Sequence, residues 1–379
     1  MRIAVNAQLL TTQENYRGAG VSNYSLRLLR AMAQTRRDGD SHHRITAFVH
    51  DPAVTLDGIE LMRSTLPLGN PLARIAWEQS ALPLLLRRAG AELVHGLVNV
   101  LPLATNVPGI VTVHDLSFVR TPEMLPPVKR RYLAALCRAS CRRARRIIAV
   151  SRQTADDLIE LFEVPARAIE VIHNGVGQEF TPTPASTEPP ARPPGPPRPD
   201  RYFLYVGTLE PRKNLELLVR AYARWRTQHR GAPIALVLAG GQGWYYDEIF
   251  ATVTQLGLAD QVIFPGFVPA ADLPGWYRGA LAFVYPSRFE GFGLPVVEAM
   301  ACGTPVICST IASLQEVAGA AALTFAPEDE ETLVAHLETV ATDAAARTDL
   351  RGRGLIQARQ FSWHNTAAAT LALYDDLLA

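Results

Sequence analysis

Residues 281–304 read LAFVYPSRFEGFGLPVVEAMACGT, in the order of a strand, a glycine loop and a helix. Leu281–Tyr285 is a short apolar run of the kind found in strands that are buried on both faces of a parallel sheet. Gly291 and Gly293 have no side chains, so the backbone N–H groups at these positions can approach a ligand closely. Pro295 suits the first turn of a helix, and the stretch therefore predicts a βα unit.

Similar apolar runs alternate with helical patterns along the whole chain, which is typical of βαβ units around parallel sheets. In the first half the expected strands are Arg2–Val5, Ile45–Val49, Leu93–His95, Ile110–Val113, Ile147–Val150 and Ile169–Ile172. In the second half they are Phe203–Val206, Ile234–Leu238, Val262–Phe264, Leu281–Tyr285, Val306–Cys308 and Ala322–Phe325. The pattern predicts an α/β protein of two Rossmann-like, doubly wound domains that face each other across a cleft at the carboxyl ends of their strands.

A proline-rich segment, Thr181–Pro199, separates the two halves with the sequence TPTPASTEPPARPPGPPRP. Proline disfavours both helices and sheet ladders, so we expect this segment to be a semi-rigid connector. The expected N-terminal domain then covers residues 1–180, and the expected C-terminal domain covers residues 200–363. Residues 364–379 have an amphipathic pattern and are expected to form a helix that packs back on the first domain.

The 379 residues are 48% hydrophobic and 19% charged, as expected of a globular protein of two domains. A net charge of +1 gives no bulk attraction to nucleic acid, which is not an expected partner. No stretch is long and apolar enough for a transmembrane helix, and the N-terminus resembles a strand rather than an export signal. We therefore expect a cytoplasmic protein in which Cys137, Cys141, Cys302 and Cys308 are buried or inert thiols.

Glu210–Asn214 reads EPRKN after the strand Phe203–Val206, so Arg212 and Lys213 lie where a strand ends and a helix begins. Two cations beside the positive end of a helix can hold a diphosphate and stabilise the charge of a departing one. Lys213 is one of two lysines among 37 basic residues, which favours a specific role over a solvated basic turn. Asn214 is a good residue for capping the following helix.

The stretch 281–304 also contains two carboxylates. Glu290 lies in the glycine loop, and Glu298 lies one turn into the helix. One of them can accept hydrogen bonds from a sugar while the other takes a ribose diol. The alternative is that Glu298 pairs with Arg288 or Arg212 and that Glu290 is exposed.

These motifs resemble the large family 4 of retaining glycosyltransferases, which have the GT-B fold and include bacterial mannosyl- and glucosyltransferases. The resemblance rests on Gly207–Asn214, on Glu290–Pro295 and on Glu298. Further landmarks of the family occur in order along the chain at Gly18-Ala19-Gly20, Val113-His114-Asp115, Ala149-Val150-Ser151, Asn174-Gly175-Val176 and Phe361-Ser362-Trp363. The similarity covers essentially the whole chain apart from the proline-rich segment.

The resemblance implies that the C-terminal half binds a nucleoside-diphosphate sugar. Arg212 and Lys213 would bind the diphosphate, Glu298 would bind the ribose hydroxyls, and Glu290 would contact the sugar. The other donor-binding residues would be Gly18, Gly20, Gly207, Val268, Phe292, Gly293 and Leu294.

In the acceptor-side half, His114 and Asp115 follow the strand Ile110–Val113. A lone histidine is more often structural, but this one ends a central strand, precedes an aspartate and matches the family's histidine. It would give a hydrogen bond to the donor sugar, and Asp115 is a weaker candidate for handling the proton of the acceptor. The loop of Gly18 and Gly20 opens a helix, so its amides are expected to approach the donor phosphates.

No metal and no cofactor are expected. Asp38-Gly39-Asp40 has the Asp-x-Asp form of metal-dependent transferases, but it precedes a strand and is expected to be a plain loop. Arg212 and Lys213 would neutralise the charge that a divalent ion neutralises elsewhere. In a retaining enzyme the acceptor attacks on the face that the nucleotide leaves, so the departing phosphate can take its proton and no protein nucleophile is needed.

Residues 129–146 read KRRYLAALCRASCRRARR, with eight basic residues and no acid. This pattern predicts a basic amphipathic helix. One interpretation is peripheral attraction to anionic lipids at the inner membrane face, which suits a lipid-linked acceptor. The other is a solvated face whose arginine stems cover apolar surface, and the residues leave both open.

The sequence thus predicts a retaining, metal-independent glycosyltransferase that moves a hexose from a nucleoside-diphosphate sugar to a glycan or lipid-linked acceptor in cell-surface polysaccharide synthesis. The resemblance favours GDP-mannose as the donor, with UDP-glucose second. One alternative is a non-enzymatic, two-lobed sugar-binding protein, which would need an export signal. The other is a GT-B phosphorylase or epimerase. A phosphorylase of the glycogen type needs a Schiff-base lysine, for which Lys129 and Lys213 are poorly placed.

Overall fold

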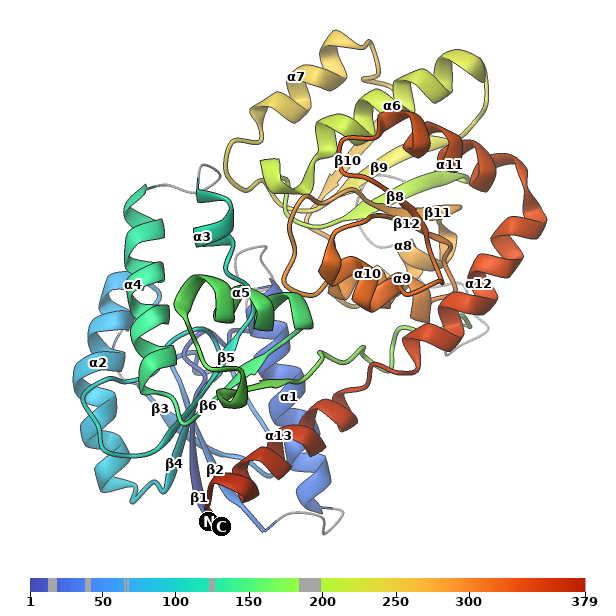
Figure 1. Ribbon diagram of the computed structural model, residues 1–379. Coiled ribbons are helices and arrows are strands. Elements are labelled where there is room, and N and C mark those ends of the chain that lie inside the picture. The colour runs from blue at the N-terminus through green and yellow to red at the C-terminus, as the bar shows by residue number, and fades with distance from the viewer. Residues whose placement is uncertain are drawn as a thin grey trace. The chain divides into compact units, whose positions relative to one another are not determined.

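The structure is a computed structural model that describes residues 1–12, 19–37, 42–64, 66, 68–122, 127–183 and 199–378. The chain divides into two compact units, of which one comprises residues 1–175 and 362–379 and the other residues 176–361 (Figure 1). Each unit has its own parallel sheet covered by helices.

The N-terminal unit is built on a parallel sheet that has, in the described ranges, seven strands in the order β3-β2-β1-β4-β5-β6-β7. These strands are β1 Arg2–Asn6, β2 Arg44–Val49, β3 Glu60–Arg63, β4 Leu93–Gly96, β5 Gly109–Val113, β6 Arg146–Ala149 and β7 Ile169–Val171. The order reverses between β1 and β4, the kind of switch point at which doubly wound sheets bind ligands. The edge strand β3 was missing from the expected strands, because its sequence ELMR is partly exposed and has no continuous apolar run.

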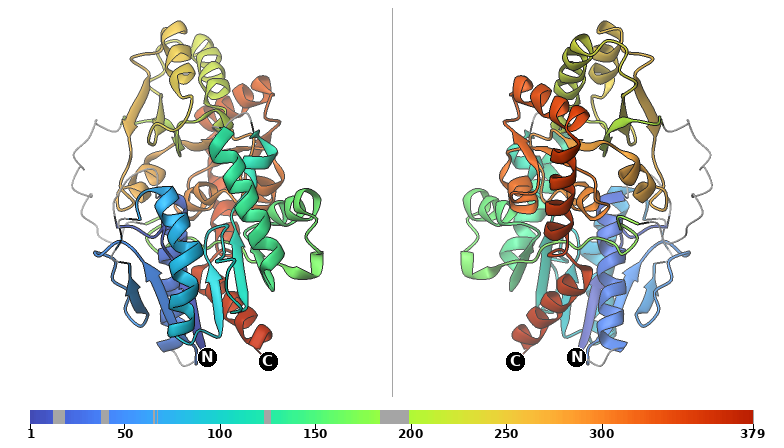
Figure 2. Two further views of the ribbon diagram at one scale, coloured as in Figure 1. Left: turned by 90° about the vertical axis from the view of Figure 1, so that its left-hand side faces the viewer. Right: turned by 90° about the vertical axis from the view of Figure 1, so that its right-hand side faces the viewer.

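Helices cover both faces of this sheet (Figures 1 and 2). Those of the described residues are α1 Ala19–Arg37, α2 Pro71–Arg88, α3 Ser117–Arg120, α4 Pro127–Arg143, α5 Arg152–Phe162 and α13 Trp363–Leu378. Successive side chains of a strand point to opposite faces. Ile3 and Val5 of β1 therefore join the core with α1 and α13, while Ala4 joins the core with α2, α4 and α5.

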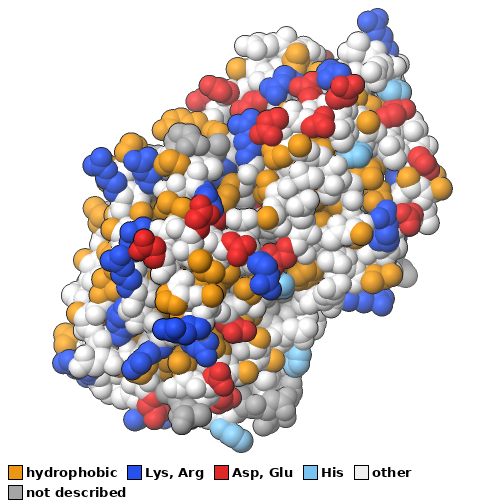
Figure 3. All heavy atoms as spheres, viewed as in Figure 1, with side chains coloured by type: hydrophobic (Ala, Val, Ile, Leu, Met, Phe, Trp, Pro, Cys, Tyr) orange, Lys and Arg blue, Asp and Glu red, His pale blue; other side chains and the backbone are white. Residues whose placement is uncertain are grey.

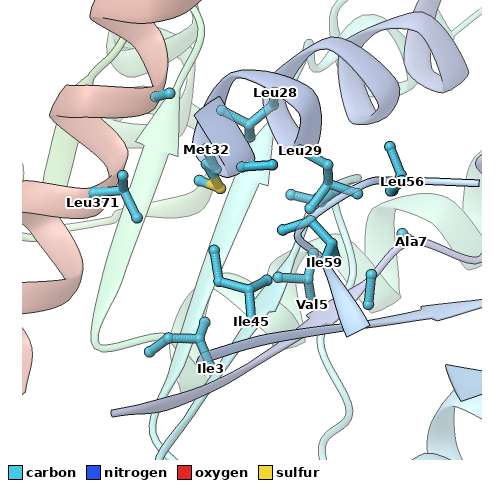
Figure 4. Close-up of a cluster of buried hydrophobic side chains, with 14 of the residues drawn as sticks. Ile3, Val5, Ala7, Leu28, Leu29, Met32, Ile45, Leu56, Ile59 and Leu371 are labelled. Atoms are coloured by element: carbon cyan, nitrogen blue, oxygen red, sulfur yellow. The ribbon is translucent and has the colours of Figure 1, made fainter. Parts of the chain in front are cut away.

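The last helix of the chain, α13, is part of the first unit and packs against α1. Leu371 belongs to the same hydrophobic cluster as Leu28, Leu29 and Met32 of α1 (Figure 4). Tyr374 is fully buried, and its hydroxyl lies 2.6 Å from Nδ1 of His95. The helix thus adds both apolar and polar contacts to the first core.

The C-terminal unit has a second parallel sheet, with six strands among its described residues in the order β10-β9-β8-β11-β12-β13. They are β8 Tyr202–Val206, β9 Ala235–Ala239, β10 Val262–Gly266, β11 Ala282–Tyr285, β12 Val306–Ser309 and β13 Leu323–Phe325. All six lie where the sequence predicts a strand, and the prediction of two doubly wound α/β sheets is confirmed. The strand order reverses between β8 and β11.

Helices also flank this second sheet. The α-helices in the part of this unit that the structure describes are α6 Leu215–Gln228, α7 Asp247–Gln255, α8 Leu273–Gly279, α9 Leu294–Ala301, α10 Ala312–Ala318, α11 Glu330–Thr342 and α12 Ala344–Ala358. A 3-10 turn, η3 Pro211–Lys213, precedes α6. The loops that begin after β8 and β11 carry the charged motifs.

The chain passes between the units at Gly175–Val176 and at Phe361–Ser362. In the second unit, Val176 N donates to Phe361 O at 3.2 Å. In the first unit, a Cβ on Gly175 would lie 2.1 Å from the backbone nitrogen of Trp363. The proline-rich segment 181–199 therefore follows the first crossing instead of forming the boundary, and its residues 184–198 lie outside the described residues.

Gly175→Ala should lower the free energy of unfolding by at least about 2 kcal/mol, because the added methyl group meets backbone that cannot turn aside. Urea or thermal unfolding measures the change. The matched control is Gly352→Ala in α12, where the Cβ position meets open space and alanine should stabilise the helix by about 0.5–1 kcal/mol. Unchanged stability of the Gly175→Ala protein would contradict the tight junction.

Candidate active site

Two loops meet at the switch point of the C-terminal sheet. Gly207–Asn214 follows β8, and Pro286–Gly293 follows β11, the neighbouring strand. Arg288 N donates a hydrogen bond to Arg212 O at 2.8 Å, so the loops are joined through their backbones. The sheet order thus brings the two sequence motifs to one place.

Asn214 joins the same loops with its side chain. Its Nδ2 donates to Pro286 O at 3.2 Å and to Pro327 O at 2.8 Å. The residue lies immediately before α6 in the left-handed conformation, with φ of 58°, and makes no side-chain capping bond. Asn214 is the N-cap residue of α6, as expected, but its side chain makes no capping bond, because its amide is oriented toward the carbonyls of two other loops.

The charged side chains of the two loops form one network. Lys213 Nζ lies 2.5 Å from Oε1 of Glu290 and donates to the hydroxyl of Tyr285 at 3.0 Å. Arg212 Nη1 lies 3.2 Å from Oε2 of the same glutamate. The Nε of this arginine lies 2.5 Å from Oε1 of Glu210. Both oxygens of Glu290 are therefore paired with a cation.

The network keeps Glu290 ionised and also shifts the pKa of Lys213. Burial acts to raise the pKa of Glu290, but the positive charges of Lys213 and Arg212 outweigh it and hold the pKa at about 2. Burial and the nearby Arg212 hold the pKa of Lys213 below its usual value, although the carboxylates of Glu290 and Glu210 act in the opposite direction. Glu290 is therefore ionised at neutral pH and can only accept hydrogen bonds.

The structure tests the alternative that Glu290 is an exposed carboxylate. Glu290 is 7% exposed and pairs with both cations, so the suggestion that it is exposed is wrong. Glu298 lies in α9, is also buried, and accepts a hydrogen bond from the Tyr277 hydroxyl at 2.9 Å. Burial raises the pKa of Tyr277 well above its usual range, so this phenol remains a donor.

Sequence reasoning missed the two tyrosines. Tyr285 and Tyr277 read as apolar positions of a strand and a helix, and their partners come from distant parts of the chain. Ser313 was also missed, and its hydroxyl donates to Glu290 O at 2.8 Å. One available signal was the position of Tyr285, the last residue of a strand at the switch point.

Other residues that the sequence expects at the donor lie in the second loop and at the start of α9. Gly293 has φ of 102°, a conformation that side chains avoid, and a Cβ there would lie 2.4 Å from Leu314. The next residue, Leu294, begins α9. The buried ring of Phe292 lies 5.7 Å from the ring of Phe361.

Two further residues that the sequence expects at the donor are Gly207, at the start of the first loop, and Val268. Gly207 N donates to Ala239 O at 2.9 Å and holds the start of the first loop against β9. Val268 is buried just after the edge strand β10.

In the N-terminal unit, His114 and Asp115 follow the central strand β5, as the sequence predicts. His114 is half-buried, and its Nε2 lies 2.8 Å from Leu97 O. Burial lowers its pKa, although Leu97 O and Asp115 act in the opposite direction. Asp115 Oδ1 accepts hydrogen bonds from the backbone nitrogen and hydroxyl of Ser117, so it stabilises a turn.

Several other positions that the sequence singles out can be located. Gly20 is exposed in the first turn of α1, whereas Gly18 and the Asp38-Gly39-Asp40 stretch lie outside the described residues.

The four cysteines are free and buried, as expected: Cys137, Cys141, Cys302 and Cys308. Among the described helices, none combines the length and the apolar composition that crossing a membrane requires.

Two family models match the chain. Residues 18–180 match the model described as Glycosyltransferase Family 4, and residues 190–355 match the model described as Glycosyl transferases group 1. O-antigen chain mannosyltransferase B of Escherichia coli is 36% identical over 265 residues, which are 70% of this chain and 69% of that protein. The serotype-specific mannosyltransferase WbdA of Escherichia coli is 32% identical over 291 residues, which are 73% of this chain and 34% of that protein.

Solved structures share the fold. Sucrose-phosphate synthase from Thermosynechococcus elongatus aligns with a TM-score of 0.80 over 100% of this chain and 99% of that chain, at 22% identity. The arrangement of two doubly wound sheets is that of the GT-B fold. With this fold, the two matched family models and the identity to mannosyltransferase B, the chain belongs to glycosyltransferase family 4 and is a glycosyltransferase.

Proposed function

We propose that this glycosyltransferase moves a hexose, with retention of configuration and without a metal ion, from a nucleoside-diphosphate sugar to a glycan or lipid-linked acceptor in cell-surface polysaccharide synthesis. GDP-mannose is the proposed donor, because the relatives named above are mannosyltransferases, and UDP-glucose is the second candidate. The observation that carries the proposal is the network of Arg212, Lys213 and Glu290 at the switch point.

Arg212 and Lys213 supply positive charge for the donor diphosphate. The side chain of Arg212 is 24% exposed, so a phosphate can reach its guanidinium, which Glu210 and Glu290 already orient. Lys213 is almost fully buried and acts as a fixed charge in poorly solvated surroundings, where charge interactions are stronger than in water. Negative charge that develops on the departing phosphate is stabilised without rearrangement of the site.

The two glutamates bind hydroxyl groups. Glu290, held ionised, accepts a hydrogen bond from the transferred sugar. A carboxylate with a pKa of about 2 is a poor base and a poor nucleophile, so the departing phosphate takes the proton of the acceptor. Glu298, held by Tyr277, accepts from the ribose diol.

Backbone groups complete the proposed donor site. Amides of Gly293 and Leu294 contact the sugar and phosphate, and Val268 lies along the nucleobase. In the N-terminal unit, His114 contacts a hydroxyl of the transferred sugar, while Asp115 is the candidate contact for the acceptor.

The alternatives fit the site less well. A pyridoxal-dependent phosphorylase needs a lysine amine that forms a Schiff base, whereas Lys213 is paired with Glu290, which stabilises its ammonium form. A sugar-binding protein needs no charged network for a diphosphate. Transfer or hydrolysis of a nucleotide-sugar separates both alternatives from the proposal.

The basic helix α4 supports a membrane contact. Arg138 donates to a carbonyl of α5 and lies 5.0 Å from the ring of Phe162, and Arg143 donates to two loop carbonyls. The exposed arginines of this segment are Arg131, Arg138 and Arg142 of α4 and Arg145 just after it. Figure 3 shows Lys and Arg side chains gathered on the side where Figure 1 draws α4. We propose that these exposed arginines attract anionic lipid headgroups, which brings the enzyme to a lipid-linked acceptor.

The donor base is tested by thermal shift with GDP, UDP and ADP. GDP should stabilise the protein most, by about 2.7 kcal/mol at a hundred times its Kd, and Arg212→Ala should lose most of that gain. The one-bond coupling between C1 and H1 of the transferred sugar, measured by NMR, then reports whether the configuration is retained. If none of the three nucleotides raises the melting temperature, the proposed function is wrong.

Glu290→Gln should lower kcat by about 10²-fold or more while GDP binding is kept or strengthened. The change removes a fixed charge beside the transferred sugar and frees Arg212 and Lys213 from their shared counter-ion. Steady-state kinetics and calorimetry with GDP measure the two effects. Glu210→Gln is the matched control, because it removes the other carboxylate that pairs with Arg212, and its loss of kcat should be much smaller.

Membrane contact is tested by sedimentation with vesicles of phosphatidylcholine, with and without phosphatidylglycerol. The triple change Arg131→Gln, Arg142→Gln and Arg145→Gln should weaken binding to the anionic vesicles about a hundredfold at low salt, at about 1 kcal/mol per arginine. Arg87→Gln with Arg88→Gln on α2 removes exposed charge elsewhere and should change little. Equal pelleting with neutral and anionic vesicles would instead favour a solvated helix face.

A further inference from the structure

The loop after β4 holds His114 at two points. Asn99 Oδ1 accepts a hydrogen bond from the backbone nitrogen of His114 at 3.0 Å. Leu97 O lies 2.8 Å from Nε2 of the imidazole. One short loop therefore fixes both the backbone and the ring of this histidine.

The loop itself is tightly folded. A Cβ on Gly96 would lie 2.1 Å from Val100 O, so the chain turns back on itself just after β4. Asn99 has φ of 56°, a left-handed conformation in which asparagine is one of the few tolerated residues. Its own nitrogen donates to Thr112 O at 2.8 Å, which ties the turn to β5. Such local strain concentrates at functional sites.

The contact with Leu97 determines which ring nitrogen carries hydrogen. A carbonyl oxygen can only accept, so the Nε2 of His114 carries the hydrogen and donates it. Burial lowers the pKa of His114 and favours the neutral ring, in which Nδ1 then has a lone pair and no hydrogen. The edge-on ring of Tyr24, with centroids 4.5 Å apart, packs against the imidazole and resists its rotation.

We propose that Asn99 is a positioning residue that, together with Leu97 O, locks His114 in the Nε2–H form so that Nδ1 accepts a hydrogen bond from a hydroxyl of the transferred hexose. The inference rests on the proposed function, in which His114 contacts that sugar. An acceptor nitrogen selects a hydroxyl group and disfavours a phosphate oxygen, which has no hydrogen to donate. The loop thus sets the kind of group that His114 recognises.

Three variants separate the backbone of Asn99 from its side chain. Asn99→Asp keeps the acceptor oxygen and tolerates the left-handed conformation, Asn99→Gly keeps the conformation alone, and Asn99→Ala keeps neither. The assay is release of GDP from GDP-mannose, or of the nucleotide that stabilises the protein in the thermal-shift screen. The aspartate variant should stay within about threefold of the parent kcat, and the other two should lose about ten- to a hundredfold with unchanged nucleotide affinity.

A control variant and a second measurement separate a positioning effect of Asn99 from a loss of stability. Asn70→Gly removes a side chain that caps α2 by accepting from Leu72 N and Ala73 N, and it should cost a little stability but no kcat. Nitrogen-15 NMR of the histidines, assigned with the His114→Ala protein, should show the Nε2–H form at neutral pH.

Parent-like kcat for Asn99→Gly, or an Nδ1–H form of His114, overturns the inference. A loss of kcat that comes with equal loss of nucleotide affinity and of folding stability also overturns it, since it marks a structural role. If His114→Ala itself keeps full kcat, the role of His114 in the proposed function is wrong, and the inference fails with it. In that case, a nucleotide that still raises the melting temperature of the protein would show that the rest of the proposed function stands.

Discussion

The ion pair between Lys213 and Glu290 is the interaction on which the C-terminal site depends. Taking an ammonium and a carboxylate out of water costs several kcal/mol per ion, which only close contact and further hydrogen bonds offset. Arg212 and the Tyr285 hydroxyl supply those bonds here. Because the partners follow β8 and β11, which are neighbours in the sheet, the strand order decides that they meet.

Stability alone does not account for this pair. Apolar residues of similar volume are often as stable as a buried ion pair, or more so. What the pair gives is a set of charges with fixed positions. Glu290 lies between the two cations and pairs with both, and Ser313 and Asn214 hold the surrounding loops through their carbonyls. The site is thus organised before a substrate is present.

The sequence was most informative where burial is continuous. All six strands of the second sheet and the glycine loop before α9 could be predicted, because apolar runs and glycine positions report directly on backbone environment. The strand β3 could not, since an edge strand with one partner needs no such run. The end of the first unit was placed too late, because prolines mark an irregular segment and not the point where contacts change.

Side-chain partners were the least predictable part of the site. The motifs identified Arg212, Lys213, Glu290 and Glu298 as chemically important, yet the pairing of Glu290 with both cations depends on strand order. Asn214 shows the same limit, since local preference favours capping and distant carbonyls override it. The hold of Asn99 on His114 was invisible for a similar reason, because a loop after one strand acts on the end of another.

The place of α13 has a consequence for how the protein is made. The first unit needs residues 362–378 to cover Leu28, Leu29 and Met32 of α1, and these residues leave the ribosome only after the whole second unit. During translation, the apolar surface that α13 covers therefore stays exposed until the second unit, which is a continuous segment, has been made. A nascent chain in that state exposes hydrophobic surface of the kind that chaperones bind.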